Sequence, residues 1–226
     1  ETVLRKKVDA ILLIGSQFLG SNWTHEETEY IIKASKELPV FLINGYVNAK
    51  NVYCILMDDF GAMYDATDKL IKSGRKKILF LHDSDTYSAM QKMSGYEAAL
   101  KDNSLPVIGD MKLKLNGNIH EVRDLLLAKK RLSFDAAVCT IDELAVSVIK
   151  YAKDRDLRIP EDIEVIGCNN SALAISCEPE LTSIYNSVQE MDEEAVNGIV
   201  RCLSGGRVKH TALFRGKLVK RNTTDF

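Results

Sequence analysis

Short apolar runs alternate with amphipathic segments along most of the chain. The runs predict strands, and residues 8–14 are expected to be buried on both faces. In the segments between them, apolar side chains recur every three or four residues, which predicts helices. This alternation is typical of an α/β fold with parallel sheets. The clearest expected strands cover residues 8–14, 40–43, 52–57, 78–81, 136–140 and 163–166.

Side chains that can accept hydrogen bonds from free backbone amides stand where these helices begin. Two of them, Thr24 and Ser187, are followed three residues later by glutamate, which is the spacing of a capping box. We therefore expect helix caps at Thr24, Ser88, Asn118, Asp142, Ser171 and Ser187.

The remaining strands are expected in the second half of the chain. Residues 107–112 form a weaker strand pattern, and residues 181–184 follow a short helix that runs from Ala172 to about Ser176. The tail, residues 212–219, reads as one further strand.

Composition narrows the class of protein. The 226 residues, 46% hydrophobic and 27% charged, suffice for two ordinary cores or one large one. With a net charge of −2, these residues lack the excess positive charge expected of a surface that binds nucleic acid. No apolar run approaches the ~18 residues of a membrane span, and the start is unlike a signal peptide. Five scattered cysteines fit a reduced compartment, so we expect a cytoplasmic protein without membrane contact.

The stretch from Ile159 to Ile184 carries the candidate chemistry. An apolar run at 163–166 stops at Gly167, and Asn169 and Asn170 follow. In an open α/β sheet, residues just past the carboxyl end of a strand line the crevice where ligands bind. Two amides there can donate and accept hydrogen bonds, which suits a polyhydroxylated or purine-like ligand, although asparagines also serve simply as turn residues.

Signatures of catalysis and of cofactor sites are missing from the sequence. It contains no G-x-S-x-G, Walker loop or G-x-G-x-x-G, and its histidines share no metal-site spacing with one another or with cysteines. Asp58 and Asp59 are adjacent, but neighbouring strand residues point to opposite faces, so a helix cap plus one cleft-lining carboxylate is expected rather than an acid/base pair. We therefore expect no enzyme, no cofactor and no metal.

Several segments resemble the effector-binding domain of the lac/gal-type bacterial repressors. The series IPEDIEVIGCNN, followed after eight residues by PELTSI, resembles that family most sharply. KMSGYEAAL at 92–100 resembles its R-x-x-G-Y-x-x-A-L helix, and LVKRNTT at 218–224 resembles its C-terminal L-V-x-R-x-S-T. Asp58–Asp59 with the segment up to Leu81, and residues 134–145, match as well, so the resemblance covers essentially the whole chain.

The resemblance implies an α/β fold of two doubly wound parallel-sheet lobes, like a periplasmic binding protein, joined by three crossovers. One lobe would comprise 1–58 and 186–215, without the first two strands of the family, and the other 59–185 and 216–226. A sugar, sugar phosphate or purine would lie between the lobes. The family's helix arginine and a polar residue after its V-I-G strand hold the effector, and here they correspond to Lys92 and Asn169.

Both positions depart from the family pattern. Lysine is a point charge that can only donate, so we expect acceptors on the ligand, and a carboxylate or phosphate on a sugar suits it better than a neutral sugar. On an exposed helix face, however, Lys92 would be a solvated lysine. Asp142, Ser88, Thr86 and Asp59 are further candidates for ligand contact, although a helix cap alone explains Ser88 and Asp142.

The chain is therefore expected to be the effector-binding and dimerisation core of a transcriptional regulator. Operator DNA would be bound by a helix-turn-helix domain that these residues do not contain, and the intact protein would be a homodimer. The alternatives are a periplasmic-type sugar-binding protein of a transporter, and a doubly wound enzyme. The sequence upstream of Glu1 distinguishes the first two, and a turnover screen tests the third.

Overall fold

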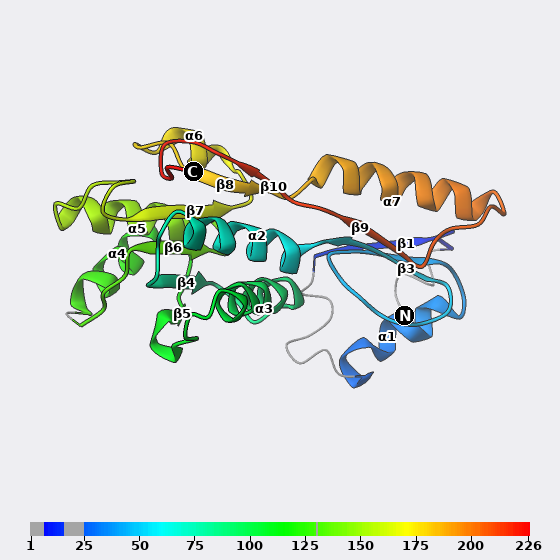
Figure 1. The fold of residues 1–226 in the computed structure, drawn as a ribbon. Coiled ribbons are helices and arrows are strands. Elements are labelled where there is room, and N and C mark those ends of the chain that lie inside the picture. Colours follow the sequence, from blue (N-terminus) through cyan, green and yellow to red (C-terminus); the bar gives the residue numbers. More distant parts are fainter. Residues whose placement is uncertain (1–6, 16–24, 130) are drawn as a thin grey trace. The chain divides into compact units, whose positions relative to one another are not determined.

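A computed structural model describes residues 7–15, 25–129 and 131–226 (Figure 1). The chain divides into two compact units. The first unit holds the chain up to Asp58 together with residues 85–88 and 187–215. The second unit holds residues 59–84, 89–186 and 216–226. Both units are α/β with parallel strands, as the apolar runs predict.

The first unit is built on a four-stranded parallel sheet in the order β1-β2-β3-β9. Its core is made by apolar side chains of β2, β3 and α1, among them Ile31, Leu42 and Val52. Gly198 lies against the Phe41 ring so closely that a Cβ would come within 2.9 Å of it, which lets α7 approach β2. The elements are β1 (Ile11–Ile14), α1 (His25–Ser35), β2 (Val40–Ile43), β3 (Val52–Met57), α7 (Val188–Leu203) and β9 (Thr211–Phe214).

The second unit is built on a six-stranded sheet in the order β10-β8-β7-β6-β4-β5, and only β10 runs antiparallel to its neighbour. Its strands are β4 (Ile78–His82), β5 (Lys112–Lys114), β6 (Ala136–Cys139), β7 (Glu164–Cys168), β8 (Thr182–Tyr185) and β10 (Lys217–Val219). Its helices are α2 (Asp59–Lys72), α3 (Tyr87–Asp102), α4 (Ile119–Ala128), α5 (Asp142–Asp154) and α6 (Ala172–Ser176). The first two residues of α3 are grouped with the first unit.

Helix α3 packs closely in the second unit through two adjacent residues, Gly95 and Tyr96. Gly95 in α3 faces the backbone carbonyl of Phe60, and a Cβ there would overlap the carbonyl oxygen. Tyr96, next to it, is buried and donates its hydroxyl proton to the Ile78 carbonyl at 2.8 Å. The Gly95–Tyr96 pair therefore fixes α3 against both α2 and β4.

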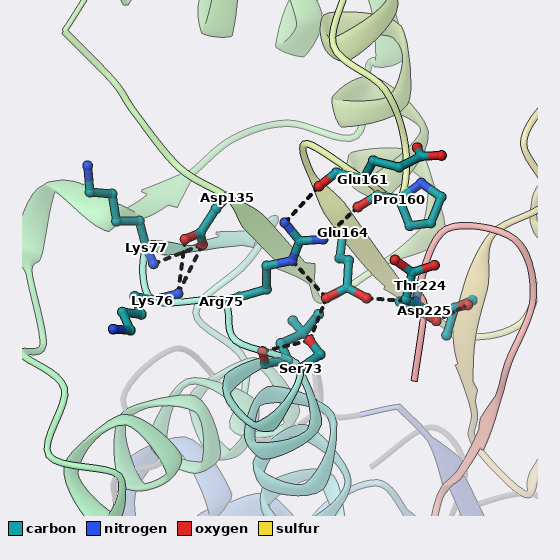
Figure 2. A network of polar contacts seen from close by, with 12 residues as sticks. Ser73, Arg75, Lys76, Lys77, Asp135, Pro160, Glu161, Glu164, Thr224 and Asp225 are labelled. Carbon is teal, nitrogen blue, oxygen red and sulfur yellow. Dashed lines mark hydrogen bonds and ion pairs between the residues drawn. The ribbon is translucent and has the colours of Figure 1, made fainter.

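A buried carboxylate joins three distant segments of the second unit, as Figure 2 shows. Glu164, at the start of β7, accepts hydrogen bonds from Ser73 Oγ at 2.6 Å, Arg75 Nε at 3.0 Å and the Asp225 amide at 2.7 Å. The Arg75 guanidinium also donates to the carbonyls of Pro160 and Glu161. The end of α2, the turn before β7 and the C-terminal tail are thus held at one charged group.

Most strand predictions are confirmed, and three segments differ. The expected strand at 107–112 is a short 3-10 helix, Gly109–Met111, followed by β5. The expected strand at 212–219 is two strands, β9 and β10, which belong to different sheets. The expected strand at 8–14 is shorter, since β1 covers only Ile11–Ile14, and it is not buried on both faces. Its side chains are only partly buried and Ile14 is 59% exposed, because β1 lies at the end of the strand order of the described sheet.

The helix caps are confirmed in part. Asn118 caps α4 by accepting from the amides of His120 and Glu121, and Ser171 caps α6 by accepting from Leu173. Ser187 occupies the N-cap position of α7, as expected, but its side chain makes no capping bond: the residue has a positive φ of 49° and its hydroxyl donates to the Arg215 carbonyl. The Thr24 capping box lies outside the described residues.

Within the described residues, no helix is both long enough and apolar enough to cross a bilayer.

Candidate functional site

Polar residues follow the carboxyl ends of neighbouring strands in the second unit. Asp83 follows β4, Thr140 follows β6, Asn169 follows β7 and Asn186 follows β8. These four strands are parallel neighbours in the order β8-β7-β6-β4, so their carboxyl ends lie along one edge of the sheet. The Thr140 hydroxyl donates to Asp83 Oδ1 at 2.9 Å. This edge is where an open α/β sheet offers a ligand site.

The turn after β7 has an unusual backbone. Asn169 and Asn170 both have positive φ angles, 100° and 47°, a region that asparagine tolerates better than most residues. Just before them, Gly167 faces Asp142 Oδ1 and Leu181, and a Cβ would overlap the carboxylate oxygen. The turn is therefore drawn tightly onto the start of α5.

The Asp142 carboxylate stabilises this turn through hydrogen bonds. It is fully buried, and its two oxygens accept from the Ser171 amide at 2.7 Å and the Ser183 hydroxyl at 2.6 Å. Ser183 Oγ in turn accepts from the Asn170 amide at 3.0 Å. The expectation that Asp142 caps its helix is wrong, since Ile141 occupies the N-cap position of α5 without a side-chain bond. Asp142 orders the turn instead, and its role as a ligand contact stays a prediction.

Arg221 holds the same turn from the C-terminal tail. Its guanidinium donates to Asn170 Oδ1 and to the Leu181 carbonyl, each at 2.7 Å. Its backbone amide donates to Thr182 Oγ1 at 2.9 Å. The arginine of the L-V-x-R-x-T-T segment is thus tied to the asparagine turn, a link that sequence reasoning missed because 51 residues separate the two positions.

Asn169 is the exposed member of the turn. Its backbone amide donates to the Ile184 carbonyl at 2.9 Å, and its Oδ1 accepts from Asn186 Nδ2 at 2.7 Å. Asn186 Oδ1 accepts from the Cys168 thiol at 3.5 Å. In the described part of the chain, the Nδ2 group of Asn169 has no acceptor, so this donor is available to a ligand.

Lys92 is buried, which corrects the expectation of a lysine on an exposed helix face. Its ammonium lies 3.1 Å from Asp59 Oδ1, and the two side chains are 9% and 5% exposed. Asp59 is the first residue of α2 rather than part of a strand, so the argument from alternating strand faces does not apply to it. The two candidates are therefore brought together as an ion pair.

The surroundings keep Lys92 charged. Burial by itself would lower the pKa of Lys92, but Cys168 and the Asp59 carboxylate act in the opposite direction and hold the pKa above its ordinary value. Burial raises the pKa of the Cys168 thiol, although Lys92 lowers it. Because burial keeps that thiol protonated at neutral pH, the carboxylates of Asp59 and Asp83 are the charges that favour the charged form of Lys92 there.

Thr86 and Ser88 belong to the first unit. Since α3 begins at Tyr87, Ser88 lies in its first turn and the expectation that it caps the helix is wrong. Both residues make further contacts of their own, and their role in ligand binding stays a prediction.

No cluster of three or more metal-ligating side chains occurs among residues 7–15, 25–129 and 131–226. Sequence reasoning missed Asp83, Thr140 and Asn186 as members of the edge. Each directly follows a strand, so the rule that identified Asn169 could have found them as well.

The chain is similar to known proteins in both sequence and fold. Residues 67–224 match the family model of the periplasmic binding protein-like domain, so the chain has the fold of that class. Two solved structures agree over 98% of the chain, each at 25% identity. They are the Escherichia coli transcriptional repressor ascG, with a TM-score of 0.83 over 80% of its chain, and a sugar-binding transcriptional regulator of the LacI family from Escherichia coli complexed with phosphate, with a TM-score of 0.84 over 79% of its chain.

The curated relatives are regulators of transcription. An HTH-type transcriptional regulator from Lachnoclostridium phytofermentans is 42% identical over 99% of this chain and 67% of its own length. The regulator AscG of Escherichia coli is 27% identical over 98% of this chain and 65% of its own length. The chain belongs to the LacI family of transcriptional regulators, and it spans about two thirds of the length of these relatives. The relatives favour a regulator over the transporter protein that the sequence left open.

Proposed function

We propose that the chain is the effector-binding and dimerisation core of a sugar-responsive transcriptional regulator. A small ligand would bind at the carboxyl edge of the second unit's sheet, and the two units would be the two lobes expected from the sequence. Ligand binding would favour one conformation of the intact protein and so change its affinity for operator DNA. DNA would be bound by a helix-turn-helix domain of the kind that gives the curated relatives their names.

The main support for this proposal is the turn at Asn169, whose backbone is fixed by hydrogen bonds. Asp142, Ser183 and Arg221 fix the backbone around it, while the Nδ2 group of Asn169 is left without an acceptor in the described residues. A donor on a rigid support at the edge of a parallel sheet suits a ligand with hydroxyl or carbonyl oxygens. A sugar offers such groups at close spacing.

The ion pair changes the expected ligand. The sequence favours an anionic sugar because Lys92 can only donate, but Asp59 already balances that charge. A phosphate at this position would have to displace a buried carboxylate from its partner, which costs more than hydrogen bonding a neutral hydroxyl. We therefore propose a neutral sugar as the effector, with sugar phosphates and purines as the competing classes.

The intact protein is proposed to be a cytoplasmic homodimer that acts without catalysis. Large apolar side chains are exposed on the helices of the second unit, including Ile175 at 60% and Leu125 at 48%. Side chains of this kind can form the self-complementary patch of a two-fold dimer. The function of the relatives, regulation of transcription, requires no turnover.

Calorimetry on the full-length protein tests the ligand. Neutral sugars, sugar phosphates and purines are titrated into the wild type, into Asn169→Ala and into the control Asn197→Ala, an exposed asparagine on α7. We expect a neutral sugar to bind, and Asn169→Ala to weaken it by about 1–3 kcal/mol, the cost of leaving a desolvated partner unpaired. Tighter binding of a sugar phosphate would refute the ligand class, and equal affinity in all three proteins would refute the site.

A further inference from the structure

We propose a second ligand site in this protein, for a small anion with an apolar body, at the opposite edge of the second unit's sheet. A hollow of about 650 Å³ lies between the residues that precede β5 and the residues between α4 and β6. Because β4, β5 and β6 are parallel, their amino-terminal ends face away from the edge that carries Asn169. The site is therefore separate from the one proposed above and rests on no part of it.

The floor of the hollow is apolar and belongs to the core. Met111, Leu113 and Leu132 line it; Met111 belongs to the hydrophobic cluster of the second unit, and the two leucines are partly buried and pack against that cluster. Met111 is 8% exposed, whereas Ile108 at the rim is 48% exposed. An apolar group that enters from solvent would thus contact an apolar surface that is close-packed against the protein interior.

The rim of the hollow is cationic. Lys129 and Arg131 line it, together with a single acidic residue, Asp110. A smaller hollow of about 160 Å³ adjoins it by sharing Ile108, and Lys76 and Lys77 border that one. Four cationic side chains therefore line two adjoining hollows, which share the apolar residues Ile108 and Met111.

None of these four cations, Lys76, Lys77, Lys129 and Arg131, has an anionic side-chain partner within the part of the chain that the structure describes. The nearby carboxylate of Asp135 is engaged by backbone instead, since it accepts from the amides of Lys76 and Lys77 at 2.9–3.2 Å. Figure 2 shows both lysine side chains pointing away from that carboxylate. Their charge is therefore left to a ligand or to solvent.

The size and charge of the hollow together identify the class of ligand. A volume of about 650 Å³ falls in the range of small-molecule sites, roughly 300–1,000 Å³. The apolar floor can contact a ring or short acyl group. Lys129 and Arg131 can donate hydrogen bonds to a carboxylate, sulfonate or phosphate. An extended acidic peptide fits less well, because the exposed edge strand β5 has only three residues with which to pair.

The probe is anilinonaphthalene sulfonate, an aromatic body with one negative charge, titrated into the full-length protein by fluorescence. Phenylnaphthylamine, its neutral counterpart, measures the apolar contribution alone. The charge variant is Lys129→Ala/Arg131→Ala. Its control is Arg207→Ala/Lys217→Ala, which removes the same charge from exposed positions that line none of these hollows. Ala128→Trp, at the exposed end of α4, fills the hollow and leaves every charge in place.

We expect saturable binding of the sulfonate that is about tenfold weaker in the charge variant and unchanged in the control, as the loss of two partly solvated charge contacts implies. The neutral probe should bind the charge variant and the wild type alike, and Ala128→Trp should weaken both probes. The proposal is overturned if the sulfonate does not saturate, if the charge variant and its control bind it equally, or if Ala128→Trp leaves both probes unaffected.

Discussion

The Lys92 ammonium lies 3.1 Å from the Asp59 carboxylate, and protein surrounds both side chains. The pair joins α3 to the first residue of α2, where the chain enters the second unit. Its charges balance one another in a place where either alone would be costly. Lys92 therefore stabilises the helices near the candidate ligand edge, whatever else it contacts.

Removal of one partner is expected to destabilise the protein strongly. Lys92→Met or Asp59→Asn leaves an unpaired buried charge and should lower the free energy of unfolding by about 3–5 kcal/mol, whereas the double variant should lose less than the sum. The folded pKa of Lys92 is raised, so the stabilisation is fully present at neutral pH and is lost only as pH rises through that folded value. Urea unfolding at pH 7 measures all four proteins, and strict additivity would show that the two charges are not coupled.

Arg221 is expected to support both stability and ligand binding. Arg221→Ala removes the donors that hold Asn170 and Leu181 and should cost about 2–3 kcal/mol of unfolding free energy. It should also weaken the ligand that calorimetry finds, because the Asn169 turn loses its support. The control is Lys220→Ala, an exposed neighbour that should change stability by no more than about 0.5 kcal/mol. If Arg221→Ala unfolds like the control, the tail does not hold the turn.

Glu164 is expected to be the most sensitive acidic residue of the network in Figure 2. It accepts from Ser73, Arg75 and the Asp225 amide, and Glu164→Gln replaces one acceptor by a donor and leaves the guanidinium without its anion. We expect a loss of about 3 kcal/mol. The matched change at the exposed Glu161 should be nearly neutral in the same thermal or urea measurement, and equal losses in the two variants would contradict the account.

Thiol reactivity should follow burial. Burial raises the pKa of Cys54, Cys139 and Cys168, so little reactive thiolate forms in the native protein at pH 8. Cys177 and Cys202 are both only partly buried, but burial still raises the pKa of Cys177, so Cys202 should be alkylated first. Mass spectrometry after brief iodoacetamide treatment locates the label, and labelling of Cys168 as fast as Cys202 would show that the ligand edge opens readily.

Local patterns were enough to predict much of the fold. The continuous apolar runs at 40–43 and 52–57 correspond residue for residue to β2 and β3, because buried parallel strands leave no polar positions to blur the pattern. The Asn118 cap was predictable since its two partners lie within three residues. The tail at 212–219 was not, because one apolar pattern fits both one long strand and two strands in different sheets.

The candidate site was predictable only where it depends on neighbouring residues. Asn169 was found because it directly follows a strand. The burial of Lys92, the link from Arg221 to Asn170 and the position of Asp142 beneath the turn all depend on contacts between residues 29 to 51 positions apart or on different helices. Local periodicity contains no signal for such contacts.

We expect a ligand at the Asn169 turn to control DNA binding by the intact protein. The most direct test is fluorescence anisotropy of the full-length protein on DNA from upstream of its own gene, with and without the sugar that calorimetry identifies. We predict that saturating sugar changes DNA affinity by about 5–150-fold, and that Asn169→Ala shifts the effect to higher sugar concentrations. DNA affinity that is identical with and without saturating sugar, or a full response in Asn169→Ala at the wild-type sugar concentration, would contradict the account.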